Sequence, residues 1–102
     1  MFFILYLSEK YITLIEKVEE KICEYFCVDK EMLVATSSYR QPSFARSYLW
    51  YILHYDCGLS VNRIAKQYGR TPRRINRVIS KIKYLIETQK AYKEHYNALC
   101  LL

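Results

Sequence analysis

The chain has 102 residues, of which 52% are hydrophobic and 25% charged, so its composition is that of one small folded domain and excludes a disordered chain. Two glycines and two prolines leave little material for the turns of an all-β fold, which favours an all-α domain. The net charge of +6 is unevenly spread: residues 1–34 carry four lysines and seven acidic residues, whereas residues 60–93 carry ten lysines and arginines against Glu87 alone. Such a basic segment is typical of proteins that bind a polyanion, usually nucleic acid and sometimes an anionic membrane; a merely solvated basic surface is the alternative.

Residues 1–10 are expected to form an apolar N-terminal tail, and residues 11–102 a single helical domain. The apolar run 1–7 is shorter than the roughly 20 residues of a transmembrane helix, and it lacks the positive start of a signal peptide. The sequence therefore predicts a cytoplasmic protein with no membrane partner.

Metal binding and catalysis find little support in the sequence. Cys23 and Cys27 are four residues apart within a helical pattern, which predicts small apolar core residues. His54 and Cys57 lie close together, but no paired zinc-finger spacing is present. His54 and His95 fall on separate predicted helices without a nucleophile nearby. We therefore expect no catalytic residue, no metal, no cofactor and no small-molecule substrate.

The first predicted helix starts at Ser8, a good N-cap, and ends near Cys27. Acidic residues occupy one face, and the apolar residues that share the other are Ile15, Val18, Ile22 and Phe26. Asp29 is expected to cap a short second helix that holds Met32 and Leu33.

A polar loop over residues 36–41 is predicted next, and Pro42 then opens a third helix that runs to about Tyr55. This helix is apolar on nearly every side. The pattern is typical of a central helix that is covered by its neighbours.

The basic segment is predicted to form two helices separated by Gly69. Ser60 caps the first, which ends at Tyr68; Thr71 caps the second, with Pro72 at its first position. The second helix has a long apolar stripe, formed by Ile75, Val78, Ile79, Ile82, Leu85 and Ile86. We expect a break over residues 88–90, followed by a softer apolar pattern of Tyr92, Tyr96 and Leu99.

Two helices joined by a glycine turn, the second beginning with basic residues, are typical of a helix-turn-helix. At about 100° per residue, Arg73 and Arg77 point away from the apolar stripe, so residues 72–86 are predicted to be a recognition helix in the major groove of double-stranded DNA. The residues predicted to contact bases there are Arg73, Arg74, Asn76 and Arg77. Those predicted to contact phosphates are Arg63, Lys66, Arg70, Thr71 and Lys81.

Four motifs, in this order, carry a resemblance to a known family: Ile-x-x-Val-x-x-x-Ile-Cys-Glu-Tyr-Phe over residues 15–26, Ser-Val-x-x-Ile-Ala-x-x-Tyr-Gly over 60–69, Val-Ile-Ser-Lys-Ile over 78–82, and Lys-Glu-His-Tyr-Asn-Ala-Leu over 93–99. From about Tyr11 to its end, the chain resembles the C-terminal DNA-binding domain of the bacterial replication initiator DnaA. The resemblance implies an all-helical fold with a Trp-repressor-like helix-turn-helix that binds short duplex boxes at replication origins. It also implies a phosphate contact at Arg46.

The chain departs from that family where the family reads sequence. The family's recognition helix opens with Gly-Arg-Asp-His-Thr-Thr, whereas residues 70–74 here are Arg-Thr-Pro-Arg-Arg. The family's loop before the central helix is rich in arginine, but this chain retains only Arg40 as a weak minor-groove candidate, with Ser38 at the matching position. The family's nucleotide-binding motif is absent. The sequence thus predicts origin-box-like DNA binding with altered specificity residues.

One alternative remains open, a helical protein-interaction domain that keeps the fold but binds no specific DNA box. The altered start of the recognition helix, the missing loop arginines and the eleven tyrosines favour it. RNA binding is a third reading, which lacks an evident stacking platform.

Overall fold

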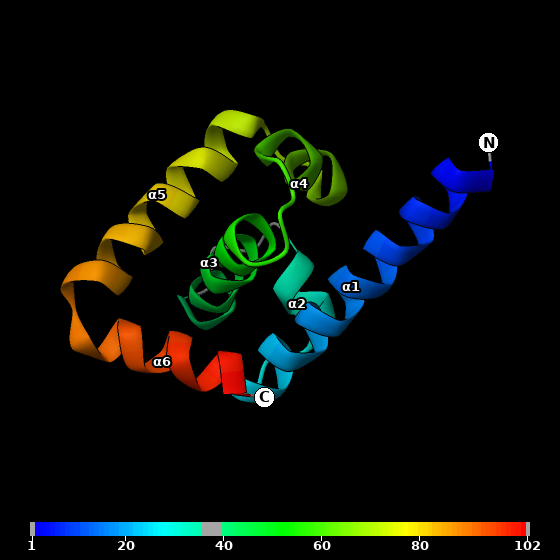
Figure 1. The fold of residues 1–102 in the computed structure, drawn as a ribbon. Helices are drawn as coiled ribbons and strands as arrows, with labels where there is room; N and C mark the ends of the chain where they lie inside the picture. Colours follow the sequence, from blue (N-terminus) through cyan, green and yellow to red (C-terminus); the bar gives the residue numbers. More distant parts are fainter. Residues whose placement is uncertain (1, 36–39, 102) are drawn as a thin grey trace.

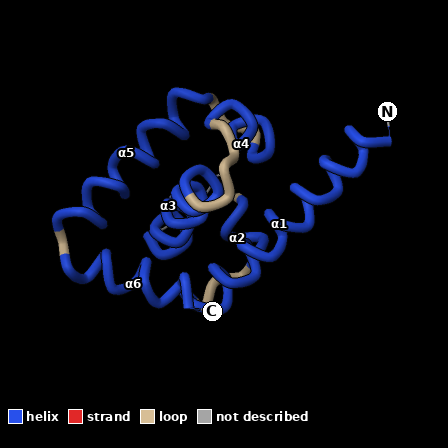
Figure 2. Tube along the Cα trace, viewed as in Figure 1, coloured by secondary structure: helices blue, strands red, loops and turns tan. Residues whose placement is uncertain are grey.

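The structure is a computed structural model that describes residues 2–35 and 40–101, with side chains for residues 12–35 and 41–101. In this part of the chain the secondary structure consists of helices joined by short turns and contains no strand, as the composition predicts (Figures 1 and 2). Its six helices are α1 (Phe2–Phe26), α2 (Lys30–Val34), α3 (Arg40–Tyr55), α4 (Val61–Tyr68), α5 (Pro72–Thr88) and α6 (Lys90–Leu101).

Helix α3 lies at the centre, with the other helices arranged around it (Figure 1). Its central position follows from its side chains, since Tyr48, Leu49, Trp50 and Leu53 are all buried. The Tyr48 hydroxyl donates a hydrogen bond to the Tyr92 carbonyl of α6, 2.9 Å away, and this bond satisfies the polar end of a buried ring. The prediction of a covered central helix is confirmed.

Helix α1 begins at Phe2, so the predicted start at Ser8 is wrong, and the helix runs across the boundary expected after residue 10. A serine caps a helix only where the chain ahead of it is non-helical, and here the apolar run continues the helix instead. The predicted apolar face is confirmed, because its four residues Ile15, Val18, Ile22 and Phe26 are all buried.

One acidic residue of α1 faces inward, contrary to the prediction. Glu19 is 5% exposed and accepts a hydrogen bond of 3.0 Å from the Tyr68 hydroxyl of α4, with the Lys30 ammonium 3.8 Å away. Burial and the neighbouring Glu19 carboxylate raise the pKa of Tyr68. This contact joins α1 to the basic half of the chain.

The end of α1 overturns a second expectation. Cys27 is exposed and has a φ of 55°, so it stops the helix in a left-handed conformation instead of filling the core. Cys23 is half-buried, and both thiols are free. No cluster of three or more metal-ligating side chains occurs among the residues whose side chains are described.

The approach to α3 differs in detail from the prediction. Asp29 stands at the N-cap of α2 but makes no side-chain capping bond. Helix α3 begins at Arg40, two residues before Pro42, which falls in the first turn where a proline is tolerated. The Gln41 amide donates to the Phe26 carbonyl at 2.7 Å and ties the start of α3 to the end of α1.

The predicted boundaries of α4 and α5 are confirmed. The Ser60 hydroxyl accepts from the Arg63 amide at 3.1 Å, and the Thr71 hydroxyl accepts from the Arg74 amide at 3.2 Å. Gly69 ends α4 with φ 64° and ψ 36°. Helix α5 ends at residue 88 and α6 begins at residue 90, where the break was expected.

Gly69→Ala should lower the free energy of unfolding by about 1 kcal/mol, because alanine resists the left-handed backbone that the turn requires. A Cβ at this position meets no heavy atom within 4 Å, so the cost is conformational and not steric. Gly69→Asn is the matched control, since asparagine tolerates this conformation better. Urea denaturation checks both variants, and equal losses would contradict the conformational explanation.

No helix in the described ranges combines the length and the apolar character needed to cross a membrane.

Candidate nucleic-acid interface

The exposed face of α5 lies directly opposite its buried stripe. Ile75, Ile79, Ile82 and Ile86 are buried. Because successive residues of a helix are about 100° apart, the side chains opposite these isoleucines must point outward. The burial of the isoleucines confirms the prediction that Arg73 and Arg77 point away from the apolar stripe. The outward side chains form a line that consists of Arg73, Arg77, Ser80 and Tyr84.

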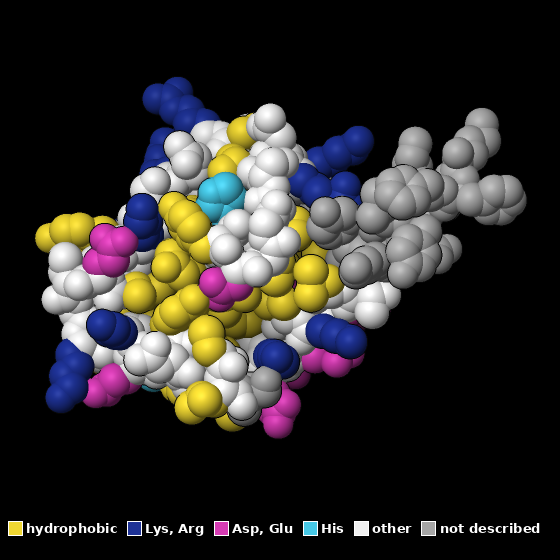
Figure 3. Space-filling view, viewed as in Figure 1, with side chains coloured by type: hydrophobic (Ala, Val, Ile, Leu, Met, Phe, Trp, Pro, Cys, Tyr) yellow, Lys and Arg dark blue, Asp and Glu magenta, His cyan; other side chains and the backbone are white. Residues whose placement is uncertain are grey.

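Helix α4 adds two basic residues to this surface. Arg63 and Lys66 are exposed, whereas Ile64 and Ala65 between them are buried. Figure 3 shows Lys and Arg side chains projecting from the end of the molecule where α4 and the start of α5 lie. Both helices therefore carry exposed cations at this end of the molecule.

A shallow concavity of about 450 Å³ opens where the turn meets α5. Its lining residues include Thr71, Arg73, Arg74 and Arg77. The Arg74 amide donates a hydrogen bond to the Thr71 hydroxyl, whereas the Arg73 amide has no hydrogen-bond acceptor among the described residues. A first-turn amide, the positive end of the helix dipole and three guanidinium groups make this concavity suited to an anion.

Arg70 also lines the concavity, but its guanidinium is already engaged with the fold. It donates to the carbonyls of Tyr68 and Val34 through Nη1, and to the Ala35 carbonyl through Nη2 at 2.6 Å. It also lies over the Trp50 ring, 5.7 Å from the ring centre. Arg70 therefore connects the turn to the end of α2, in addition to contributing positive charge.

Arg46 lies inside the protein, where it is 3% exposed. Its Nε donates to the Leu33 carbonyl at 2.6 Å, and its Nη2 donates to the Met32 carbonyl at 3.1 Å. Burial and the nearby guanidinium groups of Arg70 and Arg74 lower the pKa of Arg46. The structure thus places the predicted phosphate contact Arg46 inside the protein, where its guanidinium holds the last turn of α2.

The remaining predicted residues fall at the edges of the surface. Asn76 is exposed on one flank of the arginine line. Lys81 is exposed on the other flank, beside the start of α3. Arg40 belongs to the first turn of α3, but its side chain lies outside the described residues, as does Ser38.

Sequence reasoning missed the internal role of Arg46, although a signal for it exists. Arg46 precedes Leu49, Trp50 and Leu53 by three, four and seven residues, so it shares their buried face. An arginine on the apolar face of a central helix indicates a buried hydrogen-bonding role.

Comparison with protein-family models gave no match, and no curated protein sequence is significantly similar to the chain. The assignment of a function therefore depends on the geometry and charge of this surface.

Proposed function

We propose that the chain binds double-stranded DNA, with α4 and α5 acting as a helix-turn-helix and α5 entering the major groove. The observation that carries the proposal is the exposure of Arg73, Arg74 and Arg77 together at the start of α5. No ion pair joins them to an acidic residue in the described part of the chain. Three cations at the positive end of a helix repel one another and the helix dipole, and a bound polyanion would offset that cost.

The arrangement supports different roles for the two helices, with base contacts from α5 and phosphate contacts from α4. An α-helix with side chains is about 10–12 Å wide and fits the major groove, where an arginine can make two hydrogen bonds to one guanine. Arg73 and Arg77 are one turn apart on the outward face, which suits contacts to neighbouring base pairs. Arg63 and Lys66 on α4 are suited to phosphates on the flanking strand.

The proposal extends to the fold family. The order of the helices, the central α3 and the α4–α5 pair support a Trp-repressor-like domain related to the DNA-binding domain of DnaA. The changed residues 70–74 support a target sequence different from the family's box.

A mobility-shift assay at low salt, with selection from a pool of random duplexes, tests the proposal. We expect a shift and the enrichment of a short shared sequence. No shift at low salt would reject DNA binding and favour a protein-interaction domain. A shift without enrichment would reject the sequence-reading role of α5.

Lys66→Ala should weaken binding to all duplexes by a similar factor, because a phosphate contact carries no sequence information. It should also reduce the slope of log Kd against log salt by about 0.9, which corresponds to one phosphate contact. Lys17→Ala, on the exposed part of α1, is the control and should leave that slope unchanged. Titrations at four salt concentrations measure the slope, and identical slopes for both variants would remove Lys66 from the interface.

A further inference from the structure

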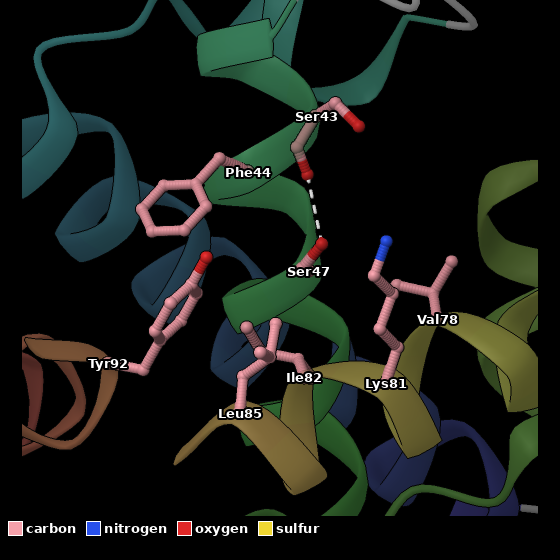
Figure 4. A pocket seen from close by; sticks show the side chains of 8 residues that line it. All are labelled: Ser43, Phe44, Ser47, Val78, Lys81, Ile82, Leu85 and Tyr92. Carbon is pink, nitrogen blue, oxygen red and sulfur yellow. Dashed lines mark hydrogen bonds between the residues drawn. The ribbon is translucent and has the colours of Figure 1, made fainter. Parts of the chain in front are cut away.

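A groove of about 440 Å³ lies between the first half of α3, the middle of α5 and the start of α6 (Figure 4). Residues of all three helices line it, and the arginines of the DNA surface do not. Its volume is within the range of small-molecule sites. The two ends of the groove differ in chemistry.

One end is polar and positive. Ser43, Ser47 and Lys81 line it, and Figure 4 shows the Lys81 ammonium and the Ser43 hydroxyl facing the same opening between α3 and α5. The Ser47 hydroxyl donates to the Ser43 carbonyl at 3.1 Å, so its oxygen can still accept. The Lys81 ammonium forms no ion pair with any acidic residue in the described ranges. This end offers an unneutralised cation on α5 and a hydroxyl donor on α3.

The other end is apolar and aromatic. The rings of Phe44 and Tyr92 meet with their centres 5.6 Å apart at an angle of 67°, and so form a corner. Ile82 and Leu85 of α5 line the groove beside this corner. Both rings line the groove, so the ring of a ligand can contact them there.

We propose that this groove binds a small aromatic anion of the aryl carboxylate class. The ring lies against Phe44, Tyr92 and Leu85, and the carboxylate accepts from the Lys81 ammonium and the Ser43 hydroxyl. A charge-assisted hydrogen bond at one end and ring contacts at the other fix the orientation of such a ligand. This ligand class follows from the combination of a positive end and an aromatic end in one groove. An apolar molecule would leave Lys81 without a partner, and a simple anion would leave the aromatic corner empty.

Bound ligand also opposes DNA binding, and this part of the inference rests on the proposed function. Lys81 is a candidate for a phosphate contact. Its ammonium cannot form a full ion pair with a carboxylate and with a DNA phosphate at the same time. Because linkage is reciprocal, the aryl carboxylate should weaken DNA binding by the same factor by which DNA weakens the carboxylate.

NMR titration of the full chain with 2-naphthoate tests ligand binding without DNA. We expect saturable shifts of the amides of Ser47, Lys81 and Tyr92, and affinity about tenfold higher than for the neutral 2-naphthylmethanol, which lacks the charge-assisted bond. Lys81→Met keeps the apolar stem and should remove that tenfold difference. Lys83→Met is the matched control, since Lys83 lies over the Tyr55 ring and does not line the groove.

Three outcomes would overturn the site: shifts that do not saturate, shifts that spread away from the groove, or identical behaviour of Lys81→Met and Lys83→Met. Leu85→Trp gives a second check, because the larger ring should fill the groove and weaken both probes. A DNA titration with and without saturating 2-naphthoate then tests the coupling. If the chain binds 2-naphthoate but no DNA, the proposed function fails while the site stands; if DNA affinity is unchanged by bound 2-naphthoate, the coupling alone is rejected.

Discussion

Replacing Arg73 and Arg77 together with alanine should reduce affinity for a selected duplex by at least about 100-fold and leave little preference over random DNA. Each bidentate arginine–guanine pair contributes about 1–3 kcal/mol of discrimination, so the loss of two is a large part of the specific affinity. Both side chains are exposed opposite the buried isoleucines, so the variant should remain folded. Fluorescence anisotropy with the selected duplex and a random duplex measures both affinities.

Two controls separate base reading from charge. Lys17→Ala/Lys93→Ala removes the same net charge from exposed positions outside the α4–α5 surface, and should weaken binding only slightly. Arg73→Lys/Arg77→Lys keeps the charge but loses the planar fork, so it should retain nonspecific affinity and lose the preference for the selected duplex. If the lysine variant keeps full specificity, the two arginines contact phosphates and not bases.

Arg46→Met should lower the free energy of unfolding by about 3 kcal/mol and the Tm by about 10 °C or more. The substitution removes the buried donors that satisfy the carbonyls of Met32 and Leu33, while methionine keeps most of the apolar stem. Hydrogen bonds to charged groups contribute about 1.5–3 kcal/mol each. Losing both therefore costs more stability than is regained by no longer burying a charged group.

The matched control for this prediction is Arg73→Met, which makes the same chemical change at an exposed site and should alter stability by less than about 0.5 kcal/mol. Urea denaturation can be followed by circular dichroism and by the fluorescence of Trp50, the single tryptophan of the chain. Equal stability of the two variants would show that Arg46 does not hold α2. For DNA affinity the order of the two effects should be reversed, so that Arg73→Met weakens binding more than Arg46→Met.

The helix boundaries in the basic half of the chain could be predicted from sequence because their causes are local. Ser60 and Thr71 satisfy amides three residues ahead, and Gly69 adopts a backbone conformation that other residues resist. The amino-terminal boundary at Ser8 was wrong for a related reason. A serine such as Ser8 can either cap a new helix or lie within a longer one, and the neighbouring residues do not determine which of the two forms.

Sequence by itself determined which faces are apolar and where the arginines of α5 point, since both follow from the period of a helix. The tertiary structure alone decided which groups the internal polar residues bind. Arg46, Arg70 and Glu19 find partners 13, 35 and 49 residues away along the chain, and no local pattern specifies such distant contacts. A charged side chain is buried only where the fold brings a partner to it, so packing separated the structural arginines from those that face outward on α5.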